Sequence, residues 1–460
     1  MTTTPNSRQL AFLALQEIYH KKAYTDIALD RVLRFPELTS VEKSLTCELV
    51  YGIVRRQRTL DRLIDLLGKK KAQQQPPNLR IILQMGLYQL RYLDHIPPSA
   101  AVDTSVKLAK QHGLKKLAGV VNGLLREYLR QASNSEPLKL PNNPITKIGI
   151  NYSFPDWIVE TFLQQLPASE VEQLCNWFNQ PAQIDLRINL LKTSLETVEK
   201  AFQDQGITTV RVPHLPQTLR LTSSAGKIDQ LPGYKAGWWI VQDSSAQLVT
   251  HLLDPQPGET IVDVCAAPGG KTTHIAELMK DRGIIYACDL SEKRLNKVQE
   301  NAQRLQLKSI KICPGDSRNL NQIFQNDSSV QFNSKFLSDR VLLDAPCSGL
   351  GTLHKRPDIR WRQTPAKIRE LSRLQQELLN QSATWVKPGG IIVYATCTLN
   401  PLENEVVIES FLQSHPEWQI HPPASDSPAN HFATSPGWIK VFPHRHNMDG
   451  FFMVKLQREF

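Results

Sequence analysis

The sequence predicts a multidomain protein with an all-α N-terminal domain, a small α+β module and a C-terminal α/β domain. The chain has 460 residues, which is too long for one ordinary domain. Apolar residues recur with helical spacing over roughly the first 130 residues. From residue 236 onward, strand-like apolar runs alternate with helical segments, which is typical of a parallel sheet covered by helices on both faces.

Five N-terminal segments each carry an apolar stripe and predict helices. They are Arg8–Ile18, Ser40–Arg55, Asn78–Leu93, Ala100–His112 and Lys115–Arg130. The polar run that follows is rich in Asn, Ser and Pro, which indicates a linker. We therefore expect a helical domain over residues 1–135 and a linker over 136–150.

Residues 151–235 mix the two periodicities, and we expect a small α+β module there. The expected helices are Phe154–Leu166, Ser169–Asn179 and Leu195–Gln205, and the expected strands are Gln183–Leu190 and Thr208–Val212.

Residues 236–460 predict the α/β domain. Its expected strands are Glu259–Ala266, Gly283–Asp289, Ser309–Cys313, Arg340–Ala345, Gly390–Ala395 and Phe451–Leu456. Its expected helices are Lys271–Met279, Ser291–Leu305, Pro365–Val386 and Glu403–His415. A polar stretch over 321–339 predicts an enlarged loop, to which we assign no role.

Composition narrows the class of protein. Hydrophobic residues make up 41% and charged residues 21%, as in a globular protein with a real core. The sequence has no apolar run of about 18 residues and no signal-like N-terminus, so we expect a cytoplasmic monomer without a membrane span. The net charge of +10 suits a polyanionic partner, although an ordinary basic surface has the same charge. Seven cysteines without a CxxC pair indicate neither a disulfide framework nor a metal site.

A glycine-rich turn after an apolar strand predicts a nucleoside site. In the run Asp263–Thr273, Gly269 and Gly270 permit a sharp turn and a close approach to a ligand. Asp289 ends the next strand, where an acid binds ribose hydroxyls, and Asp316 follows the third strand, placed for an adenine amino group. A phosphate-binding P-loop is excluded, because position 265 is Cys where that motif needs Gly.

Two cysteines follow the ends of predicted strands. Cys347 lies in Asp344-Ala-Pro-Cys-Ser-Gly and Cys397 in Tyr394-Ala-Thr-Cys-Thr. The carboxyl edge of an open α/β sheet is where ligands bind. If the two strands are neighbours, both thiols and Asp344 face one crevice. An isolated cysteine is more often a buried packing residue, but two in this setting favour function.

Methylation of carbon 5 of cytosine is a reaction that would use two thiols and a carboxylate placed in this way. Carbon 5 of cytosine is a poor nucleophile, and a thiolate that adds to carbon 6 makes it enamine-like, so that it can attack the methyl group of a sulfonium donor. An acid near N3, such as Asp344, stabilises the developing charge. A second group must then help to release the product.

These motifs resemble the Nol/Nop/Sun group of RNA cytosine-5 methyltransferases. Further matching runs are Gln242-Asp243, Pro401-Leu-Glu-Asn404-Glu, Asp449-Gly-Phe-Phe452 and Leu186-Arg-Ile-Asn189. The resemblance implies a Rossmann-like class I methyltransferase domain with S-adenosylmethionine as cofactor, Cys397 as nucleophile and Cys347 as the release helper. The expected cofactor-binding residues are Cys265, Ala266, Ala267, Pro268, Gly269, Gly270, Lys271, Asp289, Asp316 and Asp344.

The helical N-terminal part resembles the NusB RNA-binding fold. The matching residues are Gly86-Leu-Tyr88, Ile96-Pro97, Ala101-Val102, Lys107-Leu-Ala109 and Val121-Asn-Gly-Leu124. The two parts together are similar to the branch of the family that methylates cytosine 967 of bacterial 16S rRNA, which implies ribosomal RNA as partner. A different RNA target, a DNA or protein methyltransferase and a non-catalytic RNA-binding factor are the alternatives.

A basic run directly after the Cys347 motif suits RNA, because it combines cations with an aromatic ring. The expected RNA contacts are Lys355, Arg356, Arg360, Trp361 and Arg362. The alternative is a solvated charged loop.

Overall fold

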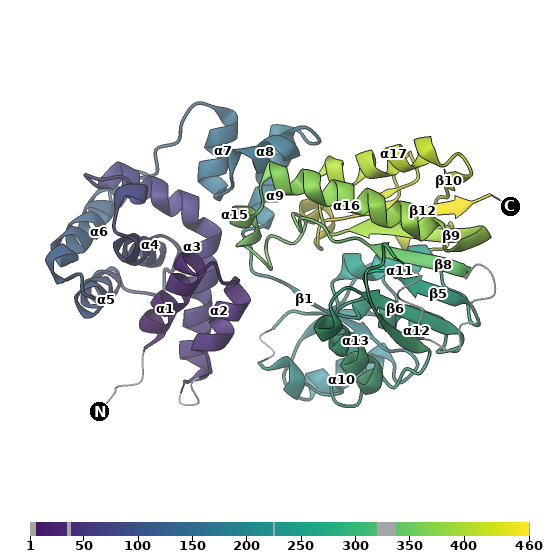
Figure 1. The fold of residues 1–460 in the computed structure, drawn as a ribbon. Helices are drawn as coiled ribbons and strands as arrows, with labels where there is room; N and C mark the ends of the chain where they lie inside the picture. Colours follow the sequence, from purple (N-terminus) through teal and green to yellow (C-terminus); the bar gives the residue numbers. More distant parts are fainter. Residues whose placement is uncertain (1–5, 35–37, 224–225, 320–336, 460) are drawn as a thin grey trace. The chain divides into compact units, whose positions relative to one another are not determined.

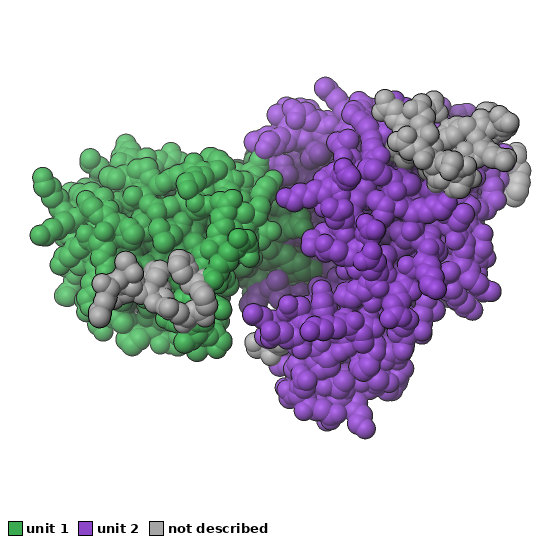
Figure 2. Space-filling model, turned by 60° about the horizontal axis from the view of Figure 1, so that its bottom comes forward, with its two compact units in different colours: residues 1–180, 353–362 green, residues 181–352, 363–460 purple. Residues whose placement is uncertain are grey.

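The computed structural model describes residues 6–34, 38–223, 226–319 and 337–459, and the chain forms two compact units (Figures 1 and 2). Unit 1 comprises residues 1–180 together with 353–362, and unit 2 comprises 181–352 and 363–460. Most of the polar loop 321–339 lies outside the described residues. The finer domain boundaries drawn from the sequence remain a prediction.

Unit 1 is helical, and each of the five predicted N-terminal helices is present. Its N-terminal helices are α1 (Ser7–His20), α2 (Thr25–Val32), α3 (Ser40–Leu67), α4 (Pro77–Tyr92), α5 (Pro98–Gln111) and α6 (Ala118–Ala132), with the 3₁₀ turns η1 (Ala72–Gln74) and η2 (Lys115–Leu117). Helix α3 begins at a capping box, in which the Thr39 hydroxyl and the Glu42 carboxylate each accept the other's backbone N–H. Helix α2 was not predicted, because eight residues make only about two turns, too few to show a stripe.

Three shorter helices complete this part of unit 1: α7 (Pro144–Tyr152), α8 (Asp156–Leu163) and α9 (Ala168–Trp177). Helix α7 corrects the expectation of a linker over 136–150. The Asn143 side chain accepts the Thr146 N–H at 3.0 Å, and Pro144 occupies the first helical position, where its missing N–H costs nothing.

Residues 353–362 return to unit 1 from far along the sequence and end in the short helix α15 (Ile359–Arg362). Arg360 is fully buried. Its guanidinium donates to the Ser153 carbonyl at 3.1 Å and the Asn179 side-chain oxygen at 3.1 Å, and it lies 4.1 Å from the centre of the Phe154 ring. Burial lowers the pKa of Arg360 well below its usual value. The segment is therefore part of the core of unit 1.

The flanking side chains of this segment are held in the same way. The Trp361 indole donates to the Val54 carbonyl at 2.7 Å. Arg362 donates to the Lys22 carbonyl and to Asp358, both at 2.9 Å.

The first sheet of unit 2 is antiparallel, with strand order β2-β3-β1-β4. It consists of β1 (Ile184–Ile188), β2 (Thr209–Arg211), β3 (Thr218–Leu221) and β4 (Trp239–Val241), with α10 (Leu195–Gln203) and the turn η3 (Ile228–Gln230). The α+β character expected of this region is confirmed. Strands β3 and β4, of four and three residues, were not predicted. Strand β4 lies beyond residue 235, yet it pairs with β1.

The second sheet of unit 2 has the described order β10-β12-β9-β8-β5-β6-β7, with β11 beside β12. Its strands are β5 (Thr260–Asp263), β6 (Ile284–Asp289), β7 (Ile310–Pro314), β8 (Ser338–Asp344), β9 (Val386–Thr396), β10 (Trp418–Ile420), β11 (Ile439–Val441) and β12 (Phe451–Arg458). The central strands are parallel, as expected. Strand β12 departs from the expectation, because it runs antiparallel to β9. Its first residues therefore lie at the carboxyl ends of the parallel strands.

Helices cover both faces of this sheet, as the alternation of strands and helices predicts (Figure 1). They are α11 (Ser244–Leu253), α12 (Gly270–Leu278), α13 (Glu292–Leu305), α16 (Pro365–Ala383), α17 (Glu405–Ser414) and α18 (Pro443–His446), with the 3₁₀ turns η4 (Pro401–Glu403) and η5 (Pro428–Phe432). Ile261 packs with residues of α11 and α12, whereas its neighbour Val262 packs with residues of α16 and α17. Successive strand residues thus serve opposite faces. Among the described residues, no helix is both long and apolar enough to cross a membrane.

We expect Arg360→Ala to lower the free energy of unfolding by about 2–4 kcal/mol, because it leaves buried oxygen acceptors without a donor. Chemical denaturation followed by circular dichroism measures this. The matched control is Arg356→Ala, four residues away and exposed, which we expect to change stability by no more than about 0.5 kcal/mol. Equal effects of the two changes would contradict a core role for Arg360.

Candidate active site

The parallel pairing brings the ends of four strands to one edge of the sheet. Asp263 of β5 pairs with Ala287 of β6 and with Leu342 of β8, and Asp344 of β8 pairs with Ala395 of β9. The loops that follow these strands therefore share one edge. The strands that precede the two cysteine motifs are neighbours, because β8 pairs directly with β9.

The two thiols meet just beyond this edge. The Sγ atoms of Cys347 and Cys397 lie 3.3 Å apart, and neither cysteine is in a disulfide. Backbone pairing holds the two loops close: Gly351 donates to the Cys397 carbonyl at 2.9 Å, and Gly450 donates to the Gly351 carbonyl at 2.8 Å. A Cβ on Gly351 would lie 1.9 Å from the Gly450 oxygen, so this crossing needs glycine.

An ion pair lies beside the thiols. Lys271 Nζ is 2.6 Å from Asp344 Oδ2, and its ammonium lies 5.1 Å from the centre of the Phe451 ring. Burial alone would lower the pKa of Lys271, but the charge of Asp344 and its hydrogen bond outweigh burial and raise that pKa. Cys397 contributes in the same direction, because a thiolate there attracts the ammonium. Lys271 is therefore a fixed cation next to the predicted nucleophile.

The pKa of Cys347 is raised well above its usual value. The hydrogen bond with Cys397 is the first cause, followed by burial and by the negative charges of Cys397 and Glu403. A thiol with a raised pKa keeps its proton at neutral pH and is a poor nucleophile. Cys347 is therefore suited to remain protonated.

The glycine turn has a left-handed backbone at Gly269 and packs closely against α13. Gly269 has a φ of 100°, and a Cβ there would lie 2.9 Å from the Val298 Cα. The rest of the turn is braced by Arg294, which donates to the Ala267 carbonyl at 2.7 Å, and by Asn301, which donates to Pro268 at 3.2 Å. The turn is therefore preorganised.

Asp289 closes this turn from the end of β6. It is 5% exposed, and it accepts the backbone N–H groups of Ser291 at 2.9 Å and Ala267 at 3.3 Å. Arg294 Nη1 also lies 3.3 Å from Asp289 Oδ2. A carboxylate can accept about four hydrogen bonds, so Asp289 with these three partners retains capacity for a ligand.

Asp263 has an acceptor without a partner. Its Oδ2 accepts the Thr272 hydroxyl at 2.7 Å, whereas its buried Oδ1 has no hydrogen-bond partner among the described residues. Burial raises the pKa of Asp263 to about 7. Such an orphaned buried oxygen is suited to a cationic or amino donor from a ligand.

The other predicted cofactor residues lie around the same turn. Cys265 packs against residues of the neighbouring strands, and Ala266 and Ala267 pack with residues of α13. Ala266 also donates to the Cys288 carbonyl at 2.8 Å. Asp316 is paired with Arg318 at 2.7 Å, and the hydrogen bond from Arg318 lowers the pKa of Asp316. Binding of adenine at Asp316 stays a prediction.

The structure corrects part of the predicted RNA interface. Arg360 is inside unit 1, where its guanidinium binds carbonyl groups and cannot reach a phosphate. Trp361 and Arg362 are likewise engaged within unit 1. Lys355 is half-buried and Arg356 is exposed, so an RNA contact of these two stays a prediction. A run of cations with an aromatic residue looks the same in the sequence whether its side chains pack inside the protein or bind RNA, so the sequence could not separate the two cases.

Sequence reasoning gave no role to Arg187, which braces the turn from the small sheet. Its side chain is fully buried and pairs with Glu277 of α12 at 2.8 Å. It also donates to the Gly270 carbonyl at 2.6 Å and the Thr273 hydroxyl at 3.0 Å. The run Leu186–Asn189 matches the family resemblance, but only the fold shows what its arginine contacts.

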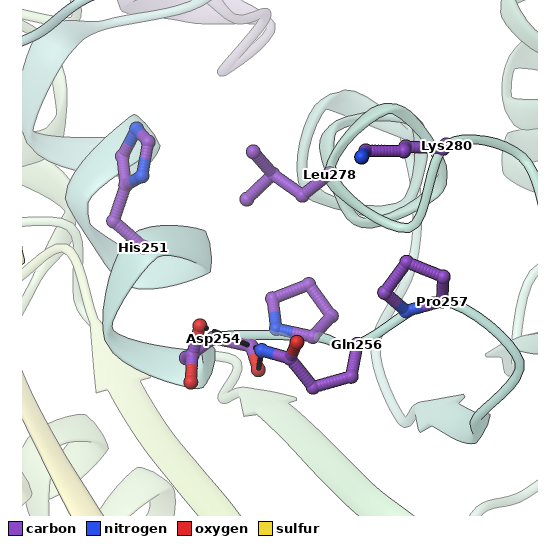
Figure 3. A pocket seen from close by; sticks show the side chains of 7 residues that line it. His251, Asp254, Gln256, Pro257, Leu278 and Lys280 are labelled. Carbon is purple, nitrogen blue, oxygen red and sulfur yellow. Dashed lines mark hydrogen bonds between the residues drawn. The ribbon is translucent and has the colours of Figure 1, made fainter.

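A separate pocket of about 310 Å³ lies away from these groups (Figure 3). It is bounded by His251 at the end of α11, by the loop that begins at Asp254, and by Leu278 and Lys280 at the end of α12. This loop leads into the start of β5. The pocket therefore lies at the amino edge of the parallel strands, opposite the thiols.

Comparison with known families divides the chain into three regions. Residues 250–457 match the family described as 16S rRNA methyltransferase RsmB/F, and residues 5–130 match the NusB family. Residues 154–227 match the ferredoxin-like domain of RsmF/B-like methyltransferases.

Full-length relatives are also similar. A probable ribosomal RNA small subunit methyltransferase B of Synechocystis sp. is 52% identical, covering 98% of this chain and 99% of the relative. Its counterpart in Bacillus subtilis is 32% identical, with 98% of both chains covered.

Solved structures share the fold. The crystal structure of PH0851 has a TM-score of 0.78 at 30% identity, with 98% of this chain and 97% of that chain covered. A methyltransferase homolog protein from Pyrococcus horikoshii has a TM-score of 0.58 at 27% identity and covers 69% of this chain and 100% of its own.

We expect Asp289→Ala to weaken binding of S-adenosylmethionine by about 1.5–3 kcal/mol, because it removes charge-assisted hydrogen bonds. Isothermal titration calorimetry measures the affinity. Asp204→Ala, at an exposed residue after α10, is the control and should bind as the parent does. Unchanged affinity of the Asp289 variant would remove Asp289 from the cofactor site.

Proposed function

Since the chain belongs to the 16S rRNA methyltransferase RsmB/F family, we propose that it methylates carbon 5 of a cytosine in 16S rRNA, at cytosine 967. The methyl donor is S-adenosylmethionine. The observation that carries the proposal is the 3.3 Å approach of two thiols beside the Lys271–Asp344 pair. Methylation of an exocyclic amino group needs no thiol, whereas methylation of carbon 5 does.

The residues around the glycine turn fit this cofactor. Gly269 lets the turn pack directly against α13, and Asp289 beside it has capacity for ribose hydroxyls. The unpartnered Oδ1 of Asp263 suits the amino group of the methionine part. When bound, S-adenosylmethionine supplies an electrophilic methyl group on a sulfonium.

Cys397 is the proposed nucleophile. The Lys271 ammonium beside it favours a thiolate, whereas the surroundings of Cys347 favour a thiol. The Cys397 sulfur adds to carbon 6 of cytosine, and the electron pair of the carbon 5–carbon 6 double bond becomes available at carbon 5. Asp344, held by Lys271, is the proposed partner of N3.

Release completes the cycle. Once carbon 5 carries the new methyl group, water accepts its proton, the electrons of that C–H bond restore the carbon 5–carbon 6 double bond, and Cys397 leaves carbon 6 as a thiolate. Cys347 lies 3.3 Å from the departing sulfur, where it can assist this elimination. This division of labour is supported by the family resemblance and by the position of both sulfurs.

Lys355 and Arg356 are the remaining proposed RNA contacts of the basic run. They follow the Cys347 motif by only a few residues, and Arg356 is exposed. Exposed cations gain free energy on binding RNA by releasing phosphate counterions.

The substrate is tested with labelled S-adenosylmethionine and purified protein. We expect label in 16S rRNA, with DNA and protein unlabelled, and bisulfite sequencing should place 5-methylcytosine at position 967. Label in a different RNA, and none in 16S rRNA, would show that the substrate is that other RNA. No transfer to any RNA, from protein that still binds RNA, would favour a non-catalytic binding factor.

The roles of the thiols follow from the order of steps, because addition precedes methyl transfer and elimination follows it. We expect Cys397→Ala to be inactive without a covalent RNA complex. Cys347→Ala should accumulate a methylated complex that survives denaturing electrophoresis. Adduct formation in the Cys347 variant should rise with pH until the Cys397 thiol is ionised.

The double variant is the control and should trap nothing, because trapping depends on Cys397. The reverse result, with RNA trapped by Cys397→Ala and not by Cys347→Ala, would exchange the two roles. A parent enzyme that methylates cytosine while neither variant forms a complex would exclude the covalent mechanism.

A further inference from the structure

Glu403 is a fully buried carboxylate that the proposed reaction does not use. It ends the 3₁₀ turn η4, between β9 and α17. Its Oε1 accepts the Ser348 backbone N–H at 2.7 Å, and its Oε2 accepts the Ser348 hydroxyl at 2.5 Å. The Thr398 hydroxyl lies 3.4 Å from Oε2 and 2.8 Å from the Ser348 hydroxyl. Burial raises the pKa of Glu403, and the hydrogen bonds from Ser348 oppose that rise.

The partners of Glu403 are the residues next to the two cysteines. Ser348 directly follows Cys347, and Thr398 directly follows Cys397. The carboxylate bonds directly to the Cys347 loop, and the Ser348 hydroxyl that it holds accepts the Thr398 hydroxyl of the Cys397 loop at 2.8 Å. Two loops from different strands are therefore linked through Glu403. Neighbouring strands lie about 4.8 Å apart, so sulfurs at 3.3 Å require the loops to converge beyond the sheet.

Further hydrogen bonds hold the residues that flank each cysteine. Gln375 of α16 donates to Glu403 Oε1 at 3.2 Å and to the Pro346 carbonyl at 2.9 Å, which braces the residue before Cys347. Asn404 accepts the Thr396 hydroxyl at 2.6 Å and donates to the Thr398 carbonyl at 3.0 Å, which braces both neighbours of Cys397.

The turn that carries Glu403 is itself anchored. The Tyr394 hydroxyl of β9 donates to the Glu403 carbonyl at 2.6 Å, and the Ser372 hydroxyl of α16 donates to the Leu402 carbonyl at 2.7 Å. The carboxylate is thus tied to the sheet and to a helix, and it has little freedom to follow a loop that moves.

We propose that Glu403 is a positioning residue that ties the loops after β8 and β9 together and thereby sets the distance between the two thiols. This rests on the proposed function of Cys397 and Cys347. A buried carboxylate would be costly without donors, and here the donors are supplied by the two loops whose separation matters for chemistry. A shift of about 1 Å in such a site can reduce the rate about 100-fold.

The direct test measures thiol proximity without the reaction. Diamide takes one hydrogen from each of two nearby thiols, forms their disulfide and becomes the hydrazine. In the parent protein we expect rapid linkage of Cys347 to Cys397, quantified by mass spectrometry of the linked peptides. In Glu403→Ala we expect this linkage to slow by about tenfold or more, because the loops separate.

Activity provides the second readout. We expect Glu403→Ala to lower kcat by about 100-fold while the affinity for S-adenosylmethionine is kept, because Asp289 and the glycine turn are untouched. Glu403→Gln keeps the length of the side chain and an acceptor for the Ser348 N–H, so it should recover part of both kcat and linkage. A general loss of structure would instead lower cofactor affinity as well.

The matched control is Glu405→Ala. Glu405 lies two residues further on and pairs with Lys440 at 2.6 Å, on β11. We expect parent-like linkage and activity. If Glu403→Ala does not fold, the linkage rate is compared in Glu403→Gln and Ser348→Ala instead. Each of these changes removes only part of the hydrogen bonding between Glu403 and Ser348.

Parent-like linkage in folded Glu403 variants would overturn the positioning role. Activity in Cys397→Ala would overturn the proposed function instead, and the linkage comparison would still stand. The two failures are therefore distinguishable.

Discussion

The parallel pairing of β5, β6, β8 and β9 is the constraint on which the candidate active site depends. Strands that run in the same direction end at the same edge, so residues separated by more than one hundred positions in the sequence become neighbours. Asp263, Asp289, Asp344 and Cys397 all follow or end such strands. The antiparallel β12 contributes because its first residues begin where the parallel strands end, which places Phe451 against Lys271.

Several charged groups lie close together at this edge, and each has a different environment. Three acids, at positions 263, 289 and 344, lie near one another, and Lys271 pairs with Asp344. Asp263 is buried without such a partner, and its pKa is correspondingly raised. The sulfurs also have different surroundings, because Cys397 lies near the Lys271 ammonium whereas the hydrogen bond with Cys397 raises the pKa of Cys347. Burial, charge and hydrogen bonding together therefore give groups of the same chemical type different environments.

The segment 353–362 shows that sequence proximity to the active site does not imply a role in it. It follows the Cys347 motif in the chain, yet it completes unit 1, where Arg360 satisfies carbonyl and amide oxygens of several helices. A chain divided at residue 181 would leave this segment without its partners. The core of the helical unit therefore depends on residues that follow the Cys347 motif in the sequence.

The sequence by itself determined the class of each region, because local patterns carry that information. Apolar spacing identified the long helices, alternation of strands and helices identified the α/β domain, and the motifs around Gly269, Cys347 and Cys397 indicated a methyltransferase. Short elements such as α2 and β4 were missed, because about two helical turns or three apolar strand residues show no clear periodicity.

The tertiary structure alone decided which side chains meet. Several features depend on contacts between segments that are distant in the sequence. They are the burial of Arg360, the hydrogen bonds of Arg187 to the glycine turn, and the hydrogen bonds through which Glu403 links the two cysteine loops. A charged residue has the same letter in a sequence whether it faces water or a carbonyl group, and only the packed chain supplies the partner that distinguishes the two.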